Sequence, residues 1–178
     1  VMQEMFLSPK RPFYQSTQTV ALNPIKRETY HRFAAAFFSE AGLTLDEEVF
    51  RSLYDRFEGH TWYVQCLLNR LYSYRQSPSE ELIRQAITKI IAENEYAYQN
   101  LIAAYPAGAV RLLKAVAKEG VVPEINAGDF ISAHRLKAAS SVNAALKKLL
   151  NKEMIYKGDK GYSVYDRFLG LWLQQQEY

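Results

Sequence analysis

Apolar side chains recur every three or four residues through most of the chain, which is the spacing of helices that bury one face. The first predicted helix starts at an Asn23 cap with Pro24 in its first position, and Gly42 ends it. The second begins at a capping box, in which the Thr44 hydroxyl and the Glu47 carboxylate satisfy two backbone donors. Both helices are expected to turn an apolar stripe toward one core.

Two more helices follow in the first part of the chain. The third comes after an interruption at residues 58–60 and carries Trp62. The fourth and longest begins at a second capping box, formed by Ser77 and Glu80. Because the loops between these helices are short, we expect residues 23–104 to form a compact helical bundle.

The order of elements changes after residue 104. Pro106 opens a helix that Gly120 ends, residues 121–125 form a short extended piece, and residues 129–136 form a second helix. These are the first two helices of the order that continues below.

A third helix and a hairpin complete this order. The helix is capped by Ser140 and Ser141, and its inward positions are Val142, Ala145, Leu146 and Leu149. Residues 154–157 and 162–165 flank a Gly-Asp-Lys-Gly turn, and Asp166 caps a closing helix. Helix-turn-helix followed by a β-hairpin is the order of a winged helix, a fold whose commonest use is binding duplex DNA.

Composition and charge refine this picture only a little. The chain has 178 residues, 48% of them hydrophobic, which is enough for a sizeable core. Residues 105–178 contain 11 Lys/Arg and 7 Asp/Glu, whereas residues 1–104 contain 11 and 12. All of the net charge of +3 thus comes from the predicted winged helix, the sign that a phosphate-bearing partner requires.

Features of other protein classes are missing from the sequence. No stretch of about 18 apolar residues predicts a membrane span, and the start lacks the cationic-then-apolar order of a signal peptide. The single cysteine, Cys66, excludes an internal disulfide and is expected to be a buried thiol. We therefore expect a cytoplasmic protein that does not bind a membrane.

The chain also lacks the motifs of a self-sufficient enzyme. It contains no Gly-x-x-x-x-Gly-Lys-Ser/Thr loop and no Gly-x-Gly-x-x-Gly turn, so it cannot cradle a nucleotide alone. Its three histidines are far apart, and no Cys/His cluster has metal-ligand spacing. The sequence predicts no catalytic residue, metal or cofactor within this chain.

The third helix of the predicted winged helix and its hairpin carry the best candidates for DNA contacts. Hydroxyl and amide side chains suit base edges, lysines suit phosphates, and a helix N-terminus can receive one more phosphate. The candidates are Ser140, Ser141, Asn143, Lys147, Lys148, Asn151, Lys157 and Lys160. The alternative is a solvated face, or one that packs within the chain.

The turn at Gly59, His60 and Thr61 is the second candidate site. With Trp62 beside it, this turn could present an imidazole and an indole to a ligand. The alternative, which composition favours, is a tight turn between helices with Trp62 in the core.

Four segments of the chain resemble the archaeal ATPase family, a group of prokaryotic P-loop ATPases of the AAA+ and signal-transduction type. They are FLSPKRPFY at 6–14, LNPI at 22–25, FEGHTWYVQ at 57–65 and YSVYDRFLGLWL at 162–173. In that family a P-loop core is followed by a helical lid and a C-terminal winged helix. The resemblance implies that this chain lies after the nucleotide-binding core.

The resemblance also divides the chain and assigns roles. It implies that residues 1–22 are the end of the core or an extended connector, that residues 23–104 are the lid, and that residues 105–178 are the winged helix. Gly59, His60 and Thr61 match a Gly-x-Pro turn near the bound adenine, with threonine in place of proline. ATP and Mg²⁺ are then expected on the upstream core of a longer parent protein, not on this chain.

The expected protein is mainly α, with a helical lid bundle followed by a winged-helix domain. Its expected function is the regulatory C-terminal region of an ATP-binding ATPase, which closes over the nucleotide and presents a face to DNA or a partner protein. Two alternatives stay open: a protein-interaction or autoinhibitory module without DNA binding, and a free-standing winged-helix transcription regulator.

Overall fold

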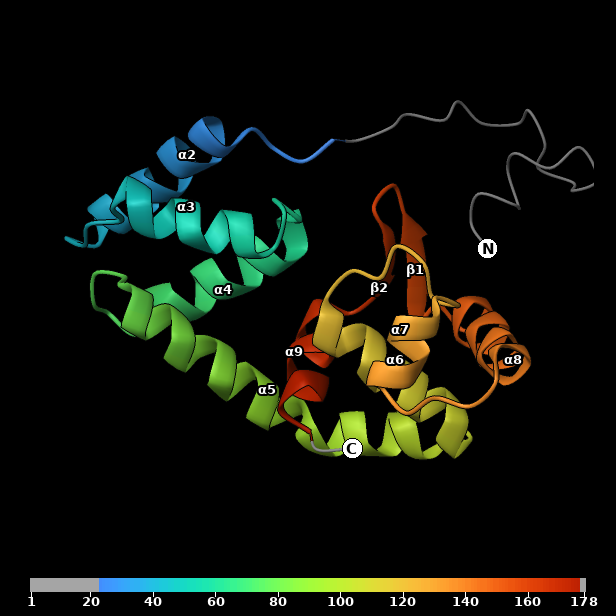
Figure 1. Cartoon of the computed structure of the whole chain (residues 1–178). Helices are drawn as coiled ribbons and strands as arrows, with labels where there is room; N and C mark the ends of the chain where they lie inside the picture. The colour runs from blue at the N-terminus through green and yellow to red at the C-terminus, as the bar shows by residue number, and fades with distance from the viewer. Residues whose placement is uncertain (1–22, 177–178) are drawn as a thin grey trace, which may run out of the picture.

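The computed structural model describes residues 23–176, which form eight helices and one two-stranded antiparallel sheet (Figure 1). The first four helices are α2 (Arg27–Glu40), α3 (Glu47–Arg56), α4 (Thr61–Ser73) and α5 (Glu80–Ala103). The remaining elements are α6 (Ala107–Glu119), α7 (Gly128–Ala133), α8 (Ala139–Asn151), β1 (Ile155–Gly158), β2 (Gly161–Val164) and α9 (Arg167–Gln175). The expectation for residues 1–22 lies outside the described residues.

The mainly α architecture predicted from the sequence is confirmed. Figure 1 shows α2, α3 and α4 on one side and α6 to α9 with the hairpin on the other, with α5 running between them. The first part of α5 packs against α3 and α4, and its later part packs against α9. At that later contact the rings of Tyr98 and Trp172 lie 5.6 Å apart.

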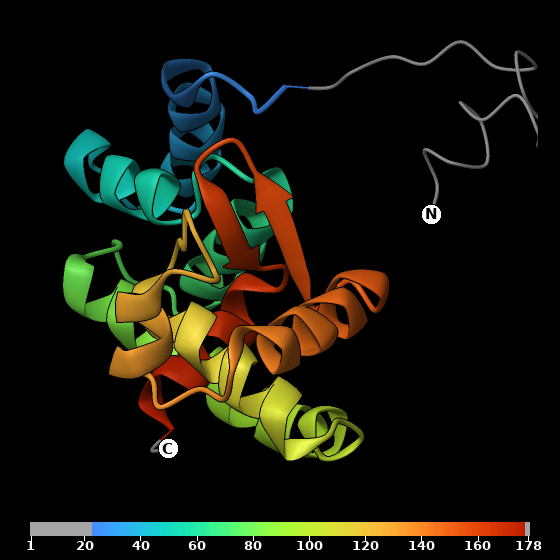
Figure 2. The same ribbon diagram turned by 45° about the vertical axis from the view of Figure 1, so that its right-hand side comes forward.

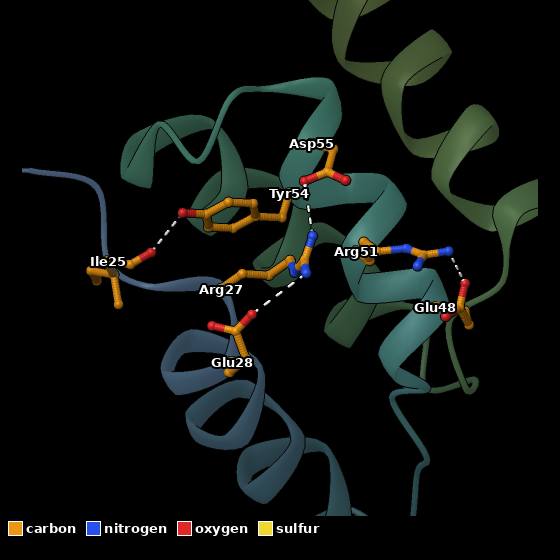
Figure 3. A network of polar contacts seen from close by, with 7 residues as sticks. All are labelled: Ile25, Arg27, Glu28, Glu48, Arg51, Tyr54 and Asp55. Carbon is orange, nitrogen blue, oxygen red and sulfur yellow. Dashed lines mark hydrogen bonds and ion pairs between the residues drawn. The ribbon is translucent and has the colours of Figure 1, made fainter.

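The predicted start of the first helix was wrong. α2 begins at Arg27, after Pro24, and its N-cap residue makes no side-chain hydrogen bond. Tertiary contacts hold the preceding chain: the Tyr54 hydroxyl donates to the Ile25 carbonyl (2.7 Å), and Arg27 forms an ion pair with Asp55 (3.6 Å; Figure 3). The chain before α2 is therefore held by contacts with α3, and the predicted Asn23 cap is not formed.

The two predicted capping boxes were wrong as well. α3 begins at Glu47 with Asp46 as its N-cap residue and no side-chain cap, so Thr44 lies before the cap position. The Thr44 backbone N–H donates to the Ser77 hydroxyl (2.9 Å), which connects two loops. With Ser77 in that bond, Ser79 is the cap of α5 and accepts from the Leu82 N–H (3.3 Å). Thr44 and Ser77, which the sequence assigned to two separate capping boxes, thus bond to each other although they are distant in sequence.

Only part of the apolar stripe of α2 enters the bundle core. Tyr30, Ala34 and Phe38 are buried, whereas Phe33 and Phe37 are 59% and 52% exposed. The largest fully buried side chains of the bundle come from α3 to α5 and the turn after α3: Phe50, Leu53, Phe57, Leu67, Leu71 and Ile83. The core therefore lies between α3, α4 and α5, and α2 covers it with one face.

The C-terminal part packs α6 against α8 and α9, with the hairpin at its edge. The strands pair from Ile155 with Val164 to Gly158 with Gly161, one residue away from the predicted bounds. A Cβ at Gly161 would lie 2.4 Å from a backbone oxygen, and its φ of 134° also requires glycine. The predicted extended piece is present as an isolated bridge from Val122 to the second strand.

Two helix ends in this part differ from the prediction. α7 stops at Ala133, because Arg135 has a φ of 49° and the Leu136 N–H bonds back to the Ile131 carbonyl. α8 starts at Ala139 without a side-chain cap, so Ser140 and Ser141 lie in its first turn instead of capping it. These shifts leave the order of the elements unchanged.

Candidate nucleic-acid interface

α8 presents one full face to solvent. Its buried side chains, Val142, Leu146 and Leu149, pack inward against α6. In both Figure 1 and Figure 2 this helix lies next to the hairpin and away from α2. The face opposite the buried side chains is therefore open to a large partner.

All eight predicted DNA-contact residues are exposed, but they point in different directions. At about 100° per residue, Ser140, Lys147 and Asn151 fall directly opposite the buried face, with Lys148 at its edge. Asn143 is turned toward the loop before α7, where its side-chain oxygen accepts from Asn126 (2.8 Å). The outward strip of α8, formed by Ser140, Lys147 and Asn151, thus contains fewer residues than were predicted to contact DNA.

Two of the lysines lie over tyrosine rings. Lys148 Nζ is 5.9 Å from the ring centroid of Tyr105, and Lys157 Nζ is 5.4 Å from that of Tyr162. A ring face attracts a cation without neutralising its charge, so these contacts restrain the ammonium groups and leave them able to bind phosphate.

The structure adds two cations that spacing alone did not indicate. Arg111 of α6 and Lys137, just before α8, line a groove of about 240 Å³ together with Ser141. Arg111 also donates to the Arg135 carbonyl (3.2 Å), which fixes its guanidinium near the turn before α8. The only signal in the sequence was a charge pattern: residues 130–152 contain five Lys/Arg and no Asp/Glu.

The second candidate site, the Gly59 turn, is built on a close contact. Gly59 has a φ of 69°, and a Cβ there would lie 2.4 Å from the Tyr54 hydroxyl. The adjoining His60 and Thr61 are exposed. Trp62 is 61% exposed, so the expectation that its ring fills the core was wrong.

This turn faces the hairpin across an open hollow of about 570 Å³. Residues of both parts line it, among them His60 and Trp62 from the bundle and Tyr156 and Tyr165 from the hairpin region. The structure therefore brings the turn close to the wing, and no residue of α8 lines the hollow between them.

Arg167, the first residue of α9, connects the two parts at this hollow. Its guanidinium donates to the Glu58 carboxylate and to the Tyr156 hydroxyl (2.9 Å). Its backbone N–H donates to the Tyr63 hydroxyl (3.0 Å), and the next residue, Phe168, packs on the Tyr63 ring at 5.3 Å. A rotation of the bundle against the hairpin would have to break these contacts.

The remaining reactive side chains have structural surroundings. His31 is bonded to the Leu45 carbonyl and His134 to the Glu119 carboxylate, both at 2.8 Å. Cys66 is half-buried, and burial raises the pKa of its thiol, which disfavours the nucleophilic thiolate. Within residues 23–176, no group of three His, Cys, Asp or Glu side chains is placed to hold a metal.

Two packed helices, an outward third helix and a paired hairpin define a winged-helix domain. In agreement, residues 96–175 match a family model described as "Probable winged helix domain". No curated protein matches the chain. None of the described helices has the length and apolar character needed to cross a membrane.

Proposed function

We propose that the winged-helix domain binds double-stranded DNA, with α8 in the major groove and the β1–β2 hairpin against the backbone. The observation that carries the proposal is the outward face of α8, where cationic, amide and hydroxyl side chains lie in a stretch, residues 130–152, without a single carboxylate. Carboxylates of a protein partner would also be attracted to this face. Phosphates on both sides of a DNA groove, however, can be contacted by all of its cationic and polar side chains.

Each residue type on this face has a suitable partner in a duplex. Asn151 and Ser140 match base edges, and Lys147 matches a phosphate at the rim of the groove. Lys157 and Lys160 on the hairpin would reach the neighbouring backbone. Arg111 and Lys137 extend the cationic surface past the start of α8, so the footprint is wider than the helix itself.

The experiment is a titration of a fluorescent duplex at several salt concentrations. The expected result is a non-specific dissociation constant in the micromolar range at low salt, which rises steeply with salt. Lys147→Ala with Lys148→Ala should weaken binding and reduce the salt slope, whereas Arg84→Ala with Lys89→Ala on α5 should not. Absence of binding at low salt, or binding unaffected by the α8 pair, contradicts the proposal.

At a finer level, we propose that this chain is the lid and winged helix of an ATP-binding ATPase, without catalysis of its own. Support comes from the resemblance to the archaeal ATPase family and from the turn at Gly59, His60 and Thr61, of which His60 and Thr61 are exposed. In such a protein ATP and Mg²⁺ bind an upstream P-loop core, and the Arg167 contacts carry the winged helix along when the lid closes. That motion would change what α8 can reach.

The coding sequence upstream of Val1 tests this finer proposal directly. A Gly-x-x-x-x-Gly-Lys-Ser/Thr segment there is expected, and the extended protein should hydrolyse ATP. Deletion of residues 105–178 from that protein tells whether the winged helix restrains turnover or only follows it. An upstream sequence without the segment would contradict the ATPase assignment and leave the DNA proposal intact.

A second candidate function is protein interaction without DNA. The observation that favours it is an apolar groove of about 280 Å³ on α2 and α4, bordered by the exposed rings of Phe33 and Phe37. Exposed rings beside an apolar groove are typical of contact surfaces between proteins. Under this reading the duplex titration shows no binding, and Phe33→Ser with Phe37→Ser abolishes the partner contact.

A further inference from the structure

The groove between α2 and α4 has a pair of exposed rings at its edge. Phe33 and Phe37 pack edge-on against each other, with their centroids 5.0 Å apart, and more than half of each side chain is exposed. The buried side chains of Ala34, Phe38 and Leu68 form apolar walls beside them. An isolated exposed ring is ordinary, but a ring pair beside an apolar groove is typical of a surface that another chain covers.

The two rings belong to a strip that runs along the whole of α2. At about 100° per residue, Thr29, Phe37 and Glu40 lie within about 40° of Phe33 around the helix axis. Lys26, the N-cap residue of α2, precedes Phe33 by almost two full turns and therefore falls on the same side. The strip thus begins with a cation, continues with two rings and ends with a carboxylate.

The charges at the two ends of this strip lack counter-ions in the part of the chain that the structure describes. No ion pair there involves Lys26 or Glu40. Each charge also lies at the end of α2 where the dipole of its own helix disfavours it, because a helix stabilises carboxylates at its N-terminus and cations at its C-terminus. A neighbouring helix that runs antiparallel to α2 reverses both placements.

We infer that a second copy of this chain covers the groove, with the two α2 helices antiparallel about a two-fold axis at Phe33. Lys26 and Glu40 are equally far from Phe33 in sequence, so this axis places Lys26 of each copy opposite Glu40 of the other. Phe37 and Thr29 are also equally far from Phe33, so a large side chain faces a smaller one. The inference rests on the protein-interaction function proposed for this groove and names its partner.

A second copy suits this surface because the surface is complementary to itself. A two-fold interface pairs one patch with the same patch, so each copy has to supply both halves of every contact. The strip supplies a ring pair beside a groove, and a cation and a carboxylate at equal distances from the axis. A parallel pairing would instead bring Lys26 to Lys26 and Glu40 to Glu40, which is repulsive.

The pairing uses neither of the other two candidate sites. No residue of α8 and no residue of the Gly59 turn lines the groove. In Figures 1 and 2, α2 lies at the outer edge of the bundle and away from α8. The duplex titration and the test for an upstream P-loop are therefore independent of the dimer.

The small size of the surface predicts a weak dimer. Two rings that are 59% and 52% exposed contribute on the order of 200 Å² per copy, against roughly 800 Å² per partner in a standard stable interface. The groove walls add to this area, and the ordering of side chains subtracts from the gain. We expect a dissociation constant of about 10–100 µM.

Sedimentation equilibrium of the full 178-residue chain tests the inference. Measurements from about 1 to 300 µM bracket the expected constant and should show a monomer that becomes a dimer. Phe33→Ser with Phe37→Ser should abolish the dimer, whereas Tyr96→Ser, which removes a ring that is 78% exposed on α5, should not. At sub-micromolar protein the variants and the parent should have the same thermal midpoint, which shows that the fold is intact.

Charge reversal tests the antiparallel register. Lys26→Glu alone or Glu40→Lys alone should weaken the dimer roughly tenfold, because two symmetry-related attractive pairs both become repulsive. The double variant Lys26→Glu with Glu40→Lys should regain the parental constant. A mixture of the two single variants should form a heterodimer, in which every pair is again of opposite charge. Lys89→Glu on α5 is the matched control and should change nothing.

A dimer that is lost in the ring variant and restored by the double reversal supports the inference. A chain that stays monomeric throughout overturns it, and so does a dimer that the ring variant leaves intact, since the copies then meet elsewhere. Loss in both single reversals without rescue by the double reversal also overturns it. If the monomeric chain binds a different protein through Phe33 and Phe37, the protein-interaction function stands and the inference of a second copy fails.

Discussion

The helical bundle and the winged-helix domain treat their charged side chains in opposite ways. In the bundle, cations lie beside carboxylates: Arg70 forms two hydrogen bonds with Glu93, and Arg51 is paired with Glu48. In the winged-helix domain, the lysines of α8 and the hairpin lie over rings or point to solvent, and residues 130–152 contain no carboxylate.

The local pairing of charges is more informative about a nucleic-acid partner than the net charge is. A total of +3 in 178 residues is too small to indicate a nucleic-acid partner. Several cations of the bundle are, however, paired with carboxylates at short range, whereas the outward face of α8 carries cations and no carboxylate.

The largest expected effect breaks the connection between the two regions. Phe168→Ala removes a ring that packs on Phe57 and Tyr63 at 5.5 and 5.3 Å. The free energy of unfolding should fall by about 3–5 kcal/mol, as for other buried aromatic truncations. Urea denaturation measures it, with the exposed Phe33→Ala as the matched control, which should change stability by less than about 0.5 kcal/mol.

A smaller effect is expected at the turn that faces the hairpin. Gly59→Ala places a Cβ at 2.4 Å from the Tyr54 hydroxyl in a backbone with φ of 69°. We expect a loss of about 1–3 kcal/mol in thermal denaturation. Gly108→Ala, in the first turn of α6 with open space around it, should be neutral or stabilising by up to about 1 kcal/mol. Equal effects of the two changes would contradict the strained turn.

Two cations outside α8, Arg111 and Lys137, test whether the unpaired charges of the winged-helix domain bind phosphates. Arg111→Ala with Lys137→Ala should reduce the slope of log affinity against log salt by about two, and weaken binding alike for all duplex sequences. An effect confined to one sequence would mean base contacts instead of phosphate contacts. Fluorescence anisotropy at three or more salt concentrations distinguishes these results.

The smallest expected effect concerns the paired charges of the bundle. The hydrogen bond from Arg70 lowers the pKa of Glu93 below its usual value. The folded-state pKa is thus below the unfolded one, so the stabilisation is complete above the unfolded pKa of about 4.3 and is lost as the pH falls through the folded pKa. Urea midpoints of Glu93→Gln and the parent should differ slightly at neutral pH and converge in acid.

The order of elements was predictable because hydrophobic spacing and turn residues specify it. The hairpin followed from Gly-Asp-Lys-Gly, and its glycine at 161 is required by a backbone oxygen at 2.4 Å. The Asp166 cap was predicted, and its carboxylate accepts from the N–H groups of Phe168 and Leu169. The hairpin turn and the Asp166 cap depend on residues that are close in sequence, whereas the backbone oxygen that requires Gly161 belongs to the distant Val122.

The predictions that were wrong or incomplete involve residues whose contacts are with residues distant in sequence. The two capping boxes are absent because α3 and α5 start two residues later, after Asp46 and Ser79, while Ser77 accepts a hydrogen bond from the distant Thr44. Hydrophobicity alone could not distinguish the exposed Trp62 from the buried Trp172, since each depends on which face of its helix meets another element. Arg111 was missed because its groove includes residues of a different helix.

α9 contacts both regions, and this has a consequence for how the protein is made. Phe168 packs on Phe57 of the bundle, and Gln174 donates to the Ala117 carbonyl of α6 (2.8 Å). A ribosome adds about 5–20 residues per second, starting from the N-terminus, so α5 and α6 emerge before α9, which packs against both. Until α9 leaves the exit tunnel, the apolar faces of α5 and α6 stay open, and nascent chains of this protein are expected to need a chaperone there.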